Sequence, residues 1–496
     1  MHILTADYAL YLTLFLPLGG MALIGALAPW PNARDIVHVG TAVLTFALVL
    51  FLLRALLAGE APTLFLFEVM PGLPLTFAIE PLGMVFALLA SGLWIVIAIY
   101  AIGYMRGNGE AHQTRFAMFF TLAIAAALGI AFSSNLFTLF IFYELLTLST
   151  YPLVAHKGTP EARNGARTYL TILLSTSIGF FLIAIIWTWT AAGTLTFEPG
   201  GILEGHVDPA LAPVLLALFA FGIGKAALMP FHRWLPAAMV APAPVSALLH
   251  AVAVVKGGVF TLLKVGVYIF GTGYLSTTGA SVWLAWVAAF TLIVSAIIAM
   301  TKDDLKARLA YSTISQLAYV TLGLALANQM GIIGGAMQMV MHAMAKITLF
   351  MCAGAIYVSA HKTRVCELDG LGRQMPFTFA AFLIASISII GLPPLGGAWS
   401  KWFLLLAAAD AHQTAMIAVL CIGSLLSIGY LMPVAGRALF LPSRDPDAPQ
   451  GIHEAPLLCV VPLCVTALGC LLLFAFGNDI YAFLLHIPML PPEAAP

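Results

Sequence analysis

The chain has 496 residues, of which 62% are hydrophobic and only 8% are charged, and its formal net charge is zero. A soluble domain is about half apolar and about a quarter charged, so this composition leaves too little polar surface to cover a water-soluble core. The balanced charge and the lack of a basic face give no reason to expect nucleic acid as a partner. The composition predicts an all-α, multi-pass protein whose solvent is a lipid bilayer.

Apolar runs separated by polar breaks predict about fourteen transmembrane spans. The long runs reach the roughly 20 residues that cross a bilayer. The first run has no small-residue cleavage site after a short apolar core, so it is predicted to be a retained span and not a signal peptide. In chain order the spans are expected near 8–30, 36–58, 81–105, 115–133, 135–155, 164–192, 211–230, 243–270, 280–300, 309–328, 331–359, 376–409, 412–440 and 456–477.

Two of the polar breaks between the predicted spans need separate description. The longest one, Gly59 to Glu80, contains three prolines and alternating apolar residues, which predicts a short hairpin at the membrane surface. The boundary between the fourth and fifth spans depends only on Ser133, Ser134 and Asn135.

The basic residues test the span count, because one side of the membrane should hold most of the Lys and Arg in short loops. Connections after odd-numbered spans hold fifteen of the 21 basic residues, whereas the opposite side has only Arg54, at a helix edge. The bacterial cytoplasmic membrane is the predicted location, with the odd-numbered loops inside and both termini on the outer, periplasmic side. The fifteen are Arg34, Arg106, Arg115, Lys157, Arg163, Arg167, Arg233, Lys302, Lys306, Arg308, Lys362, Arg364, Arg373, Arg437 and Arg444.

Five lysines, one acid and two histidines remain inside the predicted helices. Intramembrane charges cost about 2.5–3.5 kcal/mol each on insertion scales, so they are candidates for function. At 1.5 Å per residue most of them lie roughly 15–22 Å deep, in the middle of the hydrocarbon layer. Lys264 is nearer the outer end of its helix and could extend to the interface. The predicted proton-transfer residues are Glu144, Lys225, Lys256, His342, Lys346 and Lys401, with His250, Lys264, Ser312 and Ser315 as possible accessories.

Two of the predicted spans are interrupted close to a lysine. Gly222 to Pro230 contains Lys225, and Gly391 to Lys401 contains two prolines and three glycines. Broken helices at membrane depth are tolerated where the backbone lines a polar cavity. The two breaks fall on spans seven and twelve, which cross in opposite directions, as inverted repeats require. A glycine-rich packing contact with an incidental lysine is the alternative.

The repeat divides the chain into four parts. The predicted boundaries are 1–114 for spans one to three, 115–270 for the first five-span repeat, 271–440 for the second, and 441–496 for span fourteen and the tail. The repeat is imperfect, because the span equivalent to that of Glu144 offers only Ser312, Ser315 and Gln316.

The deep residues can move protons. A buried lysine loses affinity for its proton and a nearby carboxylate restores it, so a Glu144–Lys225 pair of variable distance would be a proton switch. A static ion pair is the competing interpretation. His342 and Lys346 are four residues apart and share a helix face, and histidine exchanges protons near neutral pH. The predicted order is Glu144–Lys225, Lys256, His342 with Lys346, and then Lys401, with serine hydroxyls holding water between them. His250 could equally cap a buried carbonyl.

No cofactor or metal site is predicted. The six cysteines show neither a CxxC nor a Cys/His pattern with metal spacing, and most lie in apolar runs, where cysteine behaves as a small hydrophobe. The chain has no glycine loop for nucleotide phosphates. A dedicated Na⁺ site would need clustered carboxylates, and one deep acid is too few.

These residues also resemble a known family, the antiporter-like subunits shared by Mrp-type multisubunit cation/proton antiporters, respiratory complex I and membrane-bound hydrogenases. The stretches that carry the resemblance lie between about residues 115 and 405. They are Phe142–Leu146, Gly224–Lys225, Pro230–Pro236, Ala241–His250, Asp304–Gln316, His342 with Lys346, and Gly391–Pro394.

The resemblance implies fourteen helices, two inverted five-helix repeats, and proton-transfer residues at Glu144, Lys225, Lys256 and Lys401. The D-type subunit of Mrp antiporters is the most similar branch. The implied function is proton translocation in a Na⁺(K⁺)/H⁺ antiporter, with other membrane subunits as partners. The alternative is a proton-pumping subunit of a redox complex, in which case the chain would be part of a translocating oxidoreductase. A membrane scaffold without ion flux is the third hypothesis.

Overall fold

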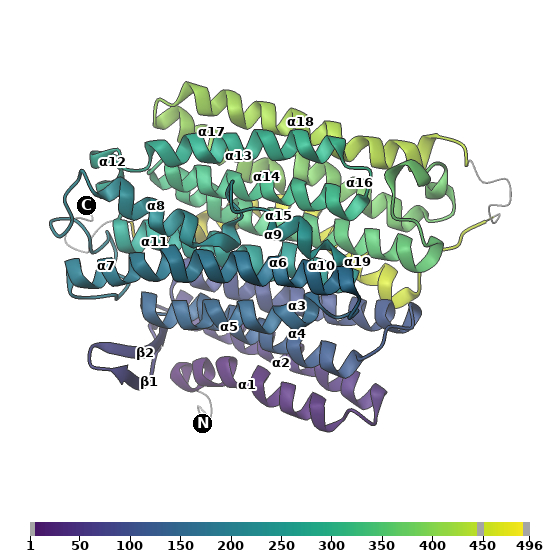
Figure 1. Ribbon diagram of the computed structural model, residues 1–496, viewed down its shortest axis with the longest axis horizontal. Helices are drawn as coiled ribbons and strands as arrows, with labels where there is room; N and C mark the ends of the chain where they lie inside the picture. Colours follow the sequence, from purple (N-terminus) through teal and green to yellow (C-terminus); the bar gives the residue numbers. More distant parts are fainter. Residues whose placement is uncertain (1–4, 444–450, 490–496) are drawn as a thin grey trace.

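The computed structural model describes residues 5–443 and 451–489. Arg444, counted above among the loop cations, lies outside the described residues. The structure is a bundle of helices running side by side, with α1 and α18 at opposite flanks and one β-hairpin at an end (Figure 1).

The first third of the chain contains a β-hairpin between two groups of long helices. Its elements are α1 (Ala6–Ala26), α2 (Pro31–Leu57), β1 (Thr63–Met70), β2 (Leu73–Ala78), α3 (Pro81–Gly107), α4 (Gln113–Phe132), α5 (Leu136–Val154), α6 (Pro160–Thr176) and α7 (Leu182–Ala192). A π-helical turn, Ser177–Phe181, joins α6 to α7, so these two form one continuous span.

The middle of the chain is the most broken. Its elements are α8 (Ala212–Gly222), α9 (Trp234–Ala237), α10 (Ala243–Ala247), α11 (Val254–Val265), α12 (Thr272–Thr278), α13 (Val282–Thr301) and α14 (Leu305–Ala325). The π-helical turn Leu248–Val252 connects α10 to α11, and a second one, Gly266–Phe270, extends α11, so the three form one span that ends at Phe270. Helix α9 lies in a segment that the sequence analysis expected to be a loop, because Pro230 and Pro236 are unfavourable in a helix.

The last part of the chain is built around α15, the longest helix. Its elements are α15 (Gln329–Ala360), α16 (Pro376–Ile390), α17 (Gly397–Asp410), α18 (Thr414–Phe440), α19 (Leu457–Ala475) and α20 (Gly477–Leu484). The short helices α12 and α20 were not expected from the sequence.

Eleven helices in the described parts of the chain are long and apolar enough to cross a membrane, so the protein is a multi-pass membrane protein. Two further apolar helices, α8 and α16, are shorter and end at breaks. Helix α14 is 21 residues long and carries the polar residues Ser312, Ser315 and Gln316.

The predicted hairpin and helix boundary are both confirmed. Strands β1 and β2 pair antiparallel over Thr63 to Ala78. Helix α4 ends at Phe132, and Asn135 caps α5 by accepting a hydrogen bond from the Thr138 N–H.

Connections that were predicted on one side contact one another. At one end Arg34 donates to Thr114 and forms an ion pair with Asp35, which also pairs with Arg106. At the other end the hairpin strand β2 contacts the connection between α4 and α5, and the Thr63 N–H donates to Asp7 at the start of α1. We call the second end the hairpin end.

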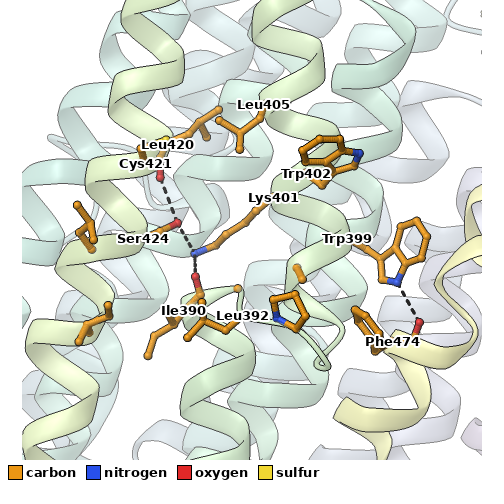
Figure 2. Close-up of a pocket in the computed structure, with 15 residues that line it drawn as sticks. Ile390, Leu392, Trp399, Lys401, Trp402, Leu405, Leu420, Cys421, Ser424 and Phe474 are labelled. Atoms are coloured by element: carbon orange, nitrogen blue, oxygen red, sulfur yellow. Dashed lines mark hydrogen bonds between the residues drawn. The ribbon is translucent and has the colours of Figure 1, made fainter.

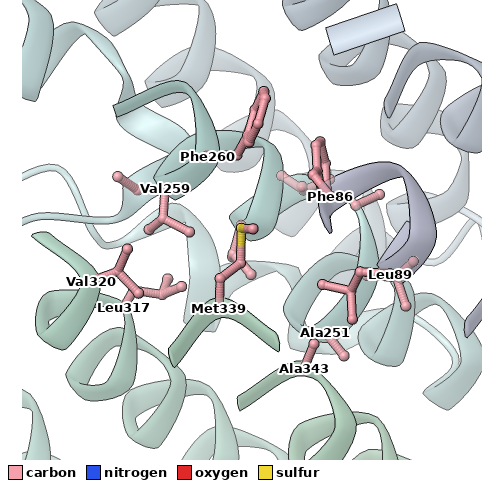
Figure 3. Packing of buried hydrophobic residues seen from close by; sticks show 14 of the residues in the cluster. Phe86, Leu89, Ala251, Val259, Phe260, Leu317, Val320, Met339 and Ala343 are labelled. Carbon is pink, nitrogen blue, oxygen red and sulfur yellow. The ribbon is translucent and has the colours of Figure 1, made fainter. Parts of the chain in front are cut away.

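The centre of the bundle is formed by α3, α11, α14 and α15, which are buried along most of their length. Figure 3 shows side chains from these helices meeting in the core. Since apolar side chains surround this region on all sides, any polar group in it is cut off from water and must find a partner inside the protein.

Candidate functional site

Lys225 lies in the gap between α8 and α9, which we call the first break. Helix α8 ends at Gly222, and Lys225 sits on a 3-10 turn, Gly224–Ala226. Its Nζ donates to the Tyr143 carbonyl at 2.8 Å and to Thr147 Oγ1 at 2.6 Å, both on α5, and it lies over the Tyr143 ring. The side chain is fully buried. The ammonium is therefore held by dipoles and a ring face.

The partner predicted for Lys225 is not in contact with it. Within the described residues no ion pair joins Glu144 to Lys225, and Glu144 Oε1 is buried without a hydrogen-bond partner. Adjacent residues on a helix point about 100° apart, and Tyr143 is the one whose carbonyl and ring contact Lys225. The Glu144 carboxylate makes no ion pair with the ammonium but is near enough to act on it electrostatically.

Lys256 and His342 meet in the middle of the bundle. Lys256 Nζ is 2.5 Å from His342 Nδ1, which joins α11 to α15. Both side chains are buried. Two glycines follow Lys256, and a Cβ on the second, Gly258, would overlap the backbone of Lys225. Glycine at this position lets α11 pack against the first break, which brings the two lysines onto neighbouring segments.

Lys346 lies on α15, one helical turn after His342. We call the buried basic residues Lys225, Lys256, His342, Lys346 and Lys401 the row. Its Nζ donates to Ser312 Oγ at 2.7 Å and to the Leu309 carbonyl at 3.2 Å, both on α14. Ser312 thus contacts the row. Ser315 instead donates to the Leu292 carbonyl on α13.

Neutral side chains that the sequence analysis did not select extend the row from α15 toward α17. Gln338 lies one turn before His342, and its amide nitrogen donates to Gln316 Oε1 at 2.9 Å. Ser400, next to Lys401, donates to Gln338 Oε1 at 2.6 Å. Uncharged amides give no charge signal in an apolar sequence, so only the alternation of polar and apolar residues on α15 could have drawn attention to Gln338.

Lys401 lies on the first turns of α17, after the second break (Gly391–Gly396). Its Nζ donates to the Ile390 carbonyl at 2.9 Å and to Ser424 Oγ on α18 at 3.0 Å (Figure 2). The carbonyl is at the C-terminal end of α16, where the helix dipole favours a cation. A groove of about 630 Å³ opens beside it.

This groove, which we call the flank groove, is mostly apolar and reaches the side of the bundle. Trp402 and Leu425 on its walls are 58% and 66% exposed. Figure 2 shows the Lys401 side chain extending toward Ser424 and Ile390. Lys401 is therefore nearer the protein surface than Lys225.

The remaining histidine has no polar partner. Both ring nitrogens of His250 are buried without a hydrogen bond within the described residues, and the ring packs on Phe350 at 4.7 Å between centroids. Of the two alternatives for His250, the one in which it caps a buried carbonyl does not hold in this structure.

Lys264 does not reach the interface, contrary to the expectation from its position. It is 1% exposed, its Nζ donates to the Ser133 carbonyl at 2.7 Å, and it lies 3.3 Å from Glu80 Oε1. Glu80 comes from the start of α3, a residue that the sequence analysis placed in a loop. Separate helices bring the pair together, so spacing along the chain could not reveal it.

Together these groups form a polar path through an apolar bundle. Lys256 contacts His342 directly, Lys346 contacts Ser312, and Gln316, Gln338 and Ser400 form a hydrogen-bonded chain between α14, α15 and α17. The second ring nitrogen of His342, Nε2, is buried without a hydrogen bond within the described residues. Lysine and histidine are able to accept and release a proton, and serine or glutamine can orient water between them.

Comparisons with known proteins give a consistent picture. Residues 133–427 match the model described as NADH:quinone oxidoreductase/Mrp antiporter, TM, and residues 71–120 match the complex I chain 5 N-terminus. NADH-quinone oxidoreductase subunit N of Desulforudis audaxviator is 32% identical over 413 residues, which are 79% of this chain and 81% of that protein.

A protein of Rhizobium meliloti named as the A/B subunit of a probable K⁺/H⁺ antiporter is 31% identical over 84% of this chain. The chain spans only 42% of the length of that relative. It spans 58% of the length of NADH-ubiquinone oxidoreductase chain 5 of Cryptococcus neoformans, which is 29% identical.

Two solved structures share the fold over nearly the whole chain. A chain of the Mrp complex from Dietzia superposes with a TM-score of 0.82 and 22% identity, covering 96% of this chain and 97% of that one. A chain of an archaeal membrane-bound sulfane sulfur reductase gives a TM-score of 0.85 at 23% identity, covering 96% of both chains.

Proposed function

This chain belongs to the NADH:quinone oxidoreductase/Mrp antiporter family of transmembrane proteins, and on that premise we propose that it translocates protons as one subunit of a multisubunit membrane complex. The path runs from Lys225 to Lys256 and His342, then along Lys346 and Gln338 to Lys401. Other membrane subunits are the partners, since the relatives are named as subunits.

The contact between Lys256 and His342 carries this proposal. Two basic side chains 2.5 Å apart in a buried site cannot both be fully protonated without strong repulsion. A shared proton between the two nitrogens removes the repulsion. A structural role would be served better by an apolar pair, because a buried ionisable pair contributes little net stability.

Glu144 acts as the switch for Lys225. In this conformation Glu144 acts on Lys225 electrostatically but forms no ion pair with it, which is the weaker of the two arrangements that the switch requires. Rotation of α5 or a change of side-chain rotamer would bring the carboxylate to the ammonium and restore its hold on the proton. Lys225 then alternates between holding and releasing a proton.

The described helices support fourteen crossings in two inverted repeats. If α8 with α9 and α16 with α17 each count as one broken span, and α14 as a full span, three crossings are added to the eleven long apolar helices. The repeats then run over 115–270 and 271–440, flanked by 1–114 and 441–496, and their broken helices carry Lys225 and Lys401. Both termini lie on the outer side of a bacterial cytoplasmic membrane.

The assembly is a Na⁺(K⁺)/H⁺ antiporter of Mrp type, with this chain as its D-type member. The row has four lysines and one deep acid, which favours protons over Na⁺ as its cargo. The exchanged cation therefore crosses wholly or partly through partner subunits. Sodium transport by the isolated chain in liposomes would contradict this division of labour.

The test is transport by the complex purified through this chain and reconstituted in liposomes. Lys225→Ala and Lys401→Ala should each reduce proton transport to the level of empty liposomes while the complex still assembles. Lys362→Ala, in a loop outside the row, is the matched control and should transport like the wild type. Unchanged flux in Lys225→Ala and Lys401→Ala would contradict the relay.

The second candidate is a proton-pumping subunit of a redox complex, favoured by the match to 81% of an NADH-quinone oxidoreductase subunit. The proteins that copurify with the chain separate the two functions. Small hydrophobic antiporter subunits support the first, and iron–sulfur or flavin subunits support the second.

A further inference from the structure

The pair formed by Glu80 and Lys264 has no place in the row described so far. Glu80 caps α3, since its carboxylate accepts from the Leu82 and Gly83 N–H groups, and the Tyr268 hydroxyl donates to Glu80 Oε2. Lys264 lies beside it, over the Phe197 ring. The Glu80 side chain is 20% exposed, whereas that of Lys264 is 1% exposed. The pair thus extends from the protein interior to the surface at the hairpin end.

Lys264 and the relay lysine Lys256 stand on one face of the same helix. They are eight residues apart on α11, so their Cα atoms are separated by about 12 Å along the axis. Phe260 is the residue midway between them, one turn from each. Its ring packs against that of Phe86 on α3, with centroids 4.9 Å apart and the planes tilted by 30° (Figure 3). The centroid of the Phe260 ring lies 5.5 Å from Lys264 Nζ.

Apolar side chains surround α11 beside Lys256. A Cβ on Gly257, next to Lys256, would be 3.2 Å from Leu146 Cδ2, 3.5 Å from Ile130 Cδ1 and 4.0 Å from Phe86 Cζ. All three of these side chains and Phe260 are fully buried. An apolar layer of this kind stays dry, which opposes proton transfer from Lys256 to Glu80 while the two rings are in contact.

We propose that Glu80 and Lys264 form a proton-release site at the hairpin end, and that the Phe86–Phe260 pair is an apolar gate between this site and Lys256. This inference rests on the proposed function, because it assigns an exit to the same row. When the rings part, water enters from the hairpin end and the proton leaves Lys256 Nζ through it to the Glu80 carboxylate. The resulting carboxylic acid then gives the proton to the outer solution.

The surrounding groups suit this task. Lys264 and the Tyr268 hydroxyl both contact the Glu80 carboxylate and fix its position at the hairpin end. After release, Lys256 is neutral and accepts its next proton from the proposed path, in which it already contacts His342. Glu80 and Lys264 each carry the same charge before and after the cycle.

The experiment measures passive proton conductance of the reconstituted complex, with a pH-sensitive dye inside the liposomes and a potassium diffusion potential. Removal of one ring in Phe260→Ala lowers the free energy needed to hydrate the gate. The expected result is a proton leak increased on the order of ten- to hundredfold. Phe379→Ala, which removes a fully buried ring on α16, is the matched control and should not increase the leak.

The second step tests the release site within the leaking variant. Glu80→Gln keeps a carbonyl oxygen for the helix cap but cannot carry the proton, so Phe260→Ala with Glu80→Gln should leak no more than the wild type. A leak that only reflects a loosened bundle would not depend on Glu80. If Phe260→Ala lowers assembly, Phe260→Leu is used, with a smaller leak expected.

Two outcomes overturn the inference: equal leaks in Phe260→Ala and Phe379→Ala, or a Phe260→Ala leak that Glu80→Gln leaves unchanged. Failure of the proposed function is a different result, namely normal coupled transport in Lys225→Ala.

Discussion

The two broken helices place a lysine in similar chemistry but in different surroundings. Lys225 and Lys401 both donate to a backbone carbonyl and to a hydroxyl group. Around Lys225 the first break is closed: Trp234 Nε1 donates to the Gly224 carbonyl at 2.9 Å, and α11 packs against the gap. Around Lys401 the flank groove opens to the side of the bundle.

The carbonyl groups of the two breaks are satisfied by different donors. Lys401 donates to the Ile390 carbonyl at the C-terminal end of α16, where the helix dipole favours a cation. At the first break Trp234 donates to the Gly224 carbonyl, and Lys225 donates instead to a carbonyl of the neighbouring helix α5. Whether the lysine at a break exchanges protons inside the chain or near its surface depends on the helices packed around the break. The first break suits an internal relay, and the second suits exchange at the flank.

The largest contrast is expected for the two tryptophans beside the breaks. Trp234→Ala removes a fully buried ring and the hydrogen bond to Gly224, so it should destabilise the chain by about 3–5 kcal/mol. Trp402→Ala removes a ring that is 58% exposed and should change stability by less than about 0.5 kcal/mol. Thermal unfolding in detergent measures both. Equal losses would mean that the two breaks are packed alike.

Exchange of each lysine for arginine sharpens the comparison at the site itself. Lys225→Arg forces a larger, planar group into a closed space and should cost about 1–3 kcal/mol in overpacking. Lys401→Arg can extend into the flank groove, so its complex should assemble at the wild-type level. Arginine does not release its proton, so both variants should lose transport. Size-exclusion chromatography of the complex measures assembly, and poor assembly of Lys401→Arg would show that the groove is closed.

A smaller contrast is expected for the hydroxyl groups. Thr147→Val leaves the buried Lys225 ammonium with one acceptor fewer and should cost about 1–3 kcal/mol. Ser424→Ala should cost less, because Lys401 has room to move beside the groove. The unfolding temperatures of the two variants test this order, and a larger shift in Ser424→Ala would reverse it.

The sequence predicted those features that depend on local chemistry. Glycine and proline predicted both breaks, and the cost of membrane-buried charge selected Lys225, Lys256, Lys346 and Lys401. Contacts between separate helices could not be predicted in this way. The Glu80–Lys264 pair joins α3 to α11, and the Gln316–Gln338–Ser400 connection joins three helices through neutral groups that carry no charge signal.

The orientation of Glu144 shows a second limit. Span depth placed it level with Lys225, but neighbouring residues on α5 point in different directions, and Tyr143 occupies the position beside the ammonium. Depth can be estimated from the sequence at 1.5 Å per residue, whereas the direction of a side chain in an apolar helix cannot, because every face of such a helix is hydrophobic.

The most direct test of a continuous relay is proton transport by His342→Gln in the reconstituted complex. Glutamine keeps a polar group near Lys256 but cannot accept and release the proton. His38→Gln, which alters a buried histidine on α2 that accepts a hydrogen bond from Trp94, is the control. The relay predicts that His342→Gln assembles normally and loses transport while His38→Gln retains it. Wild-type transport by His342→Gln would contradict the relay.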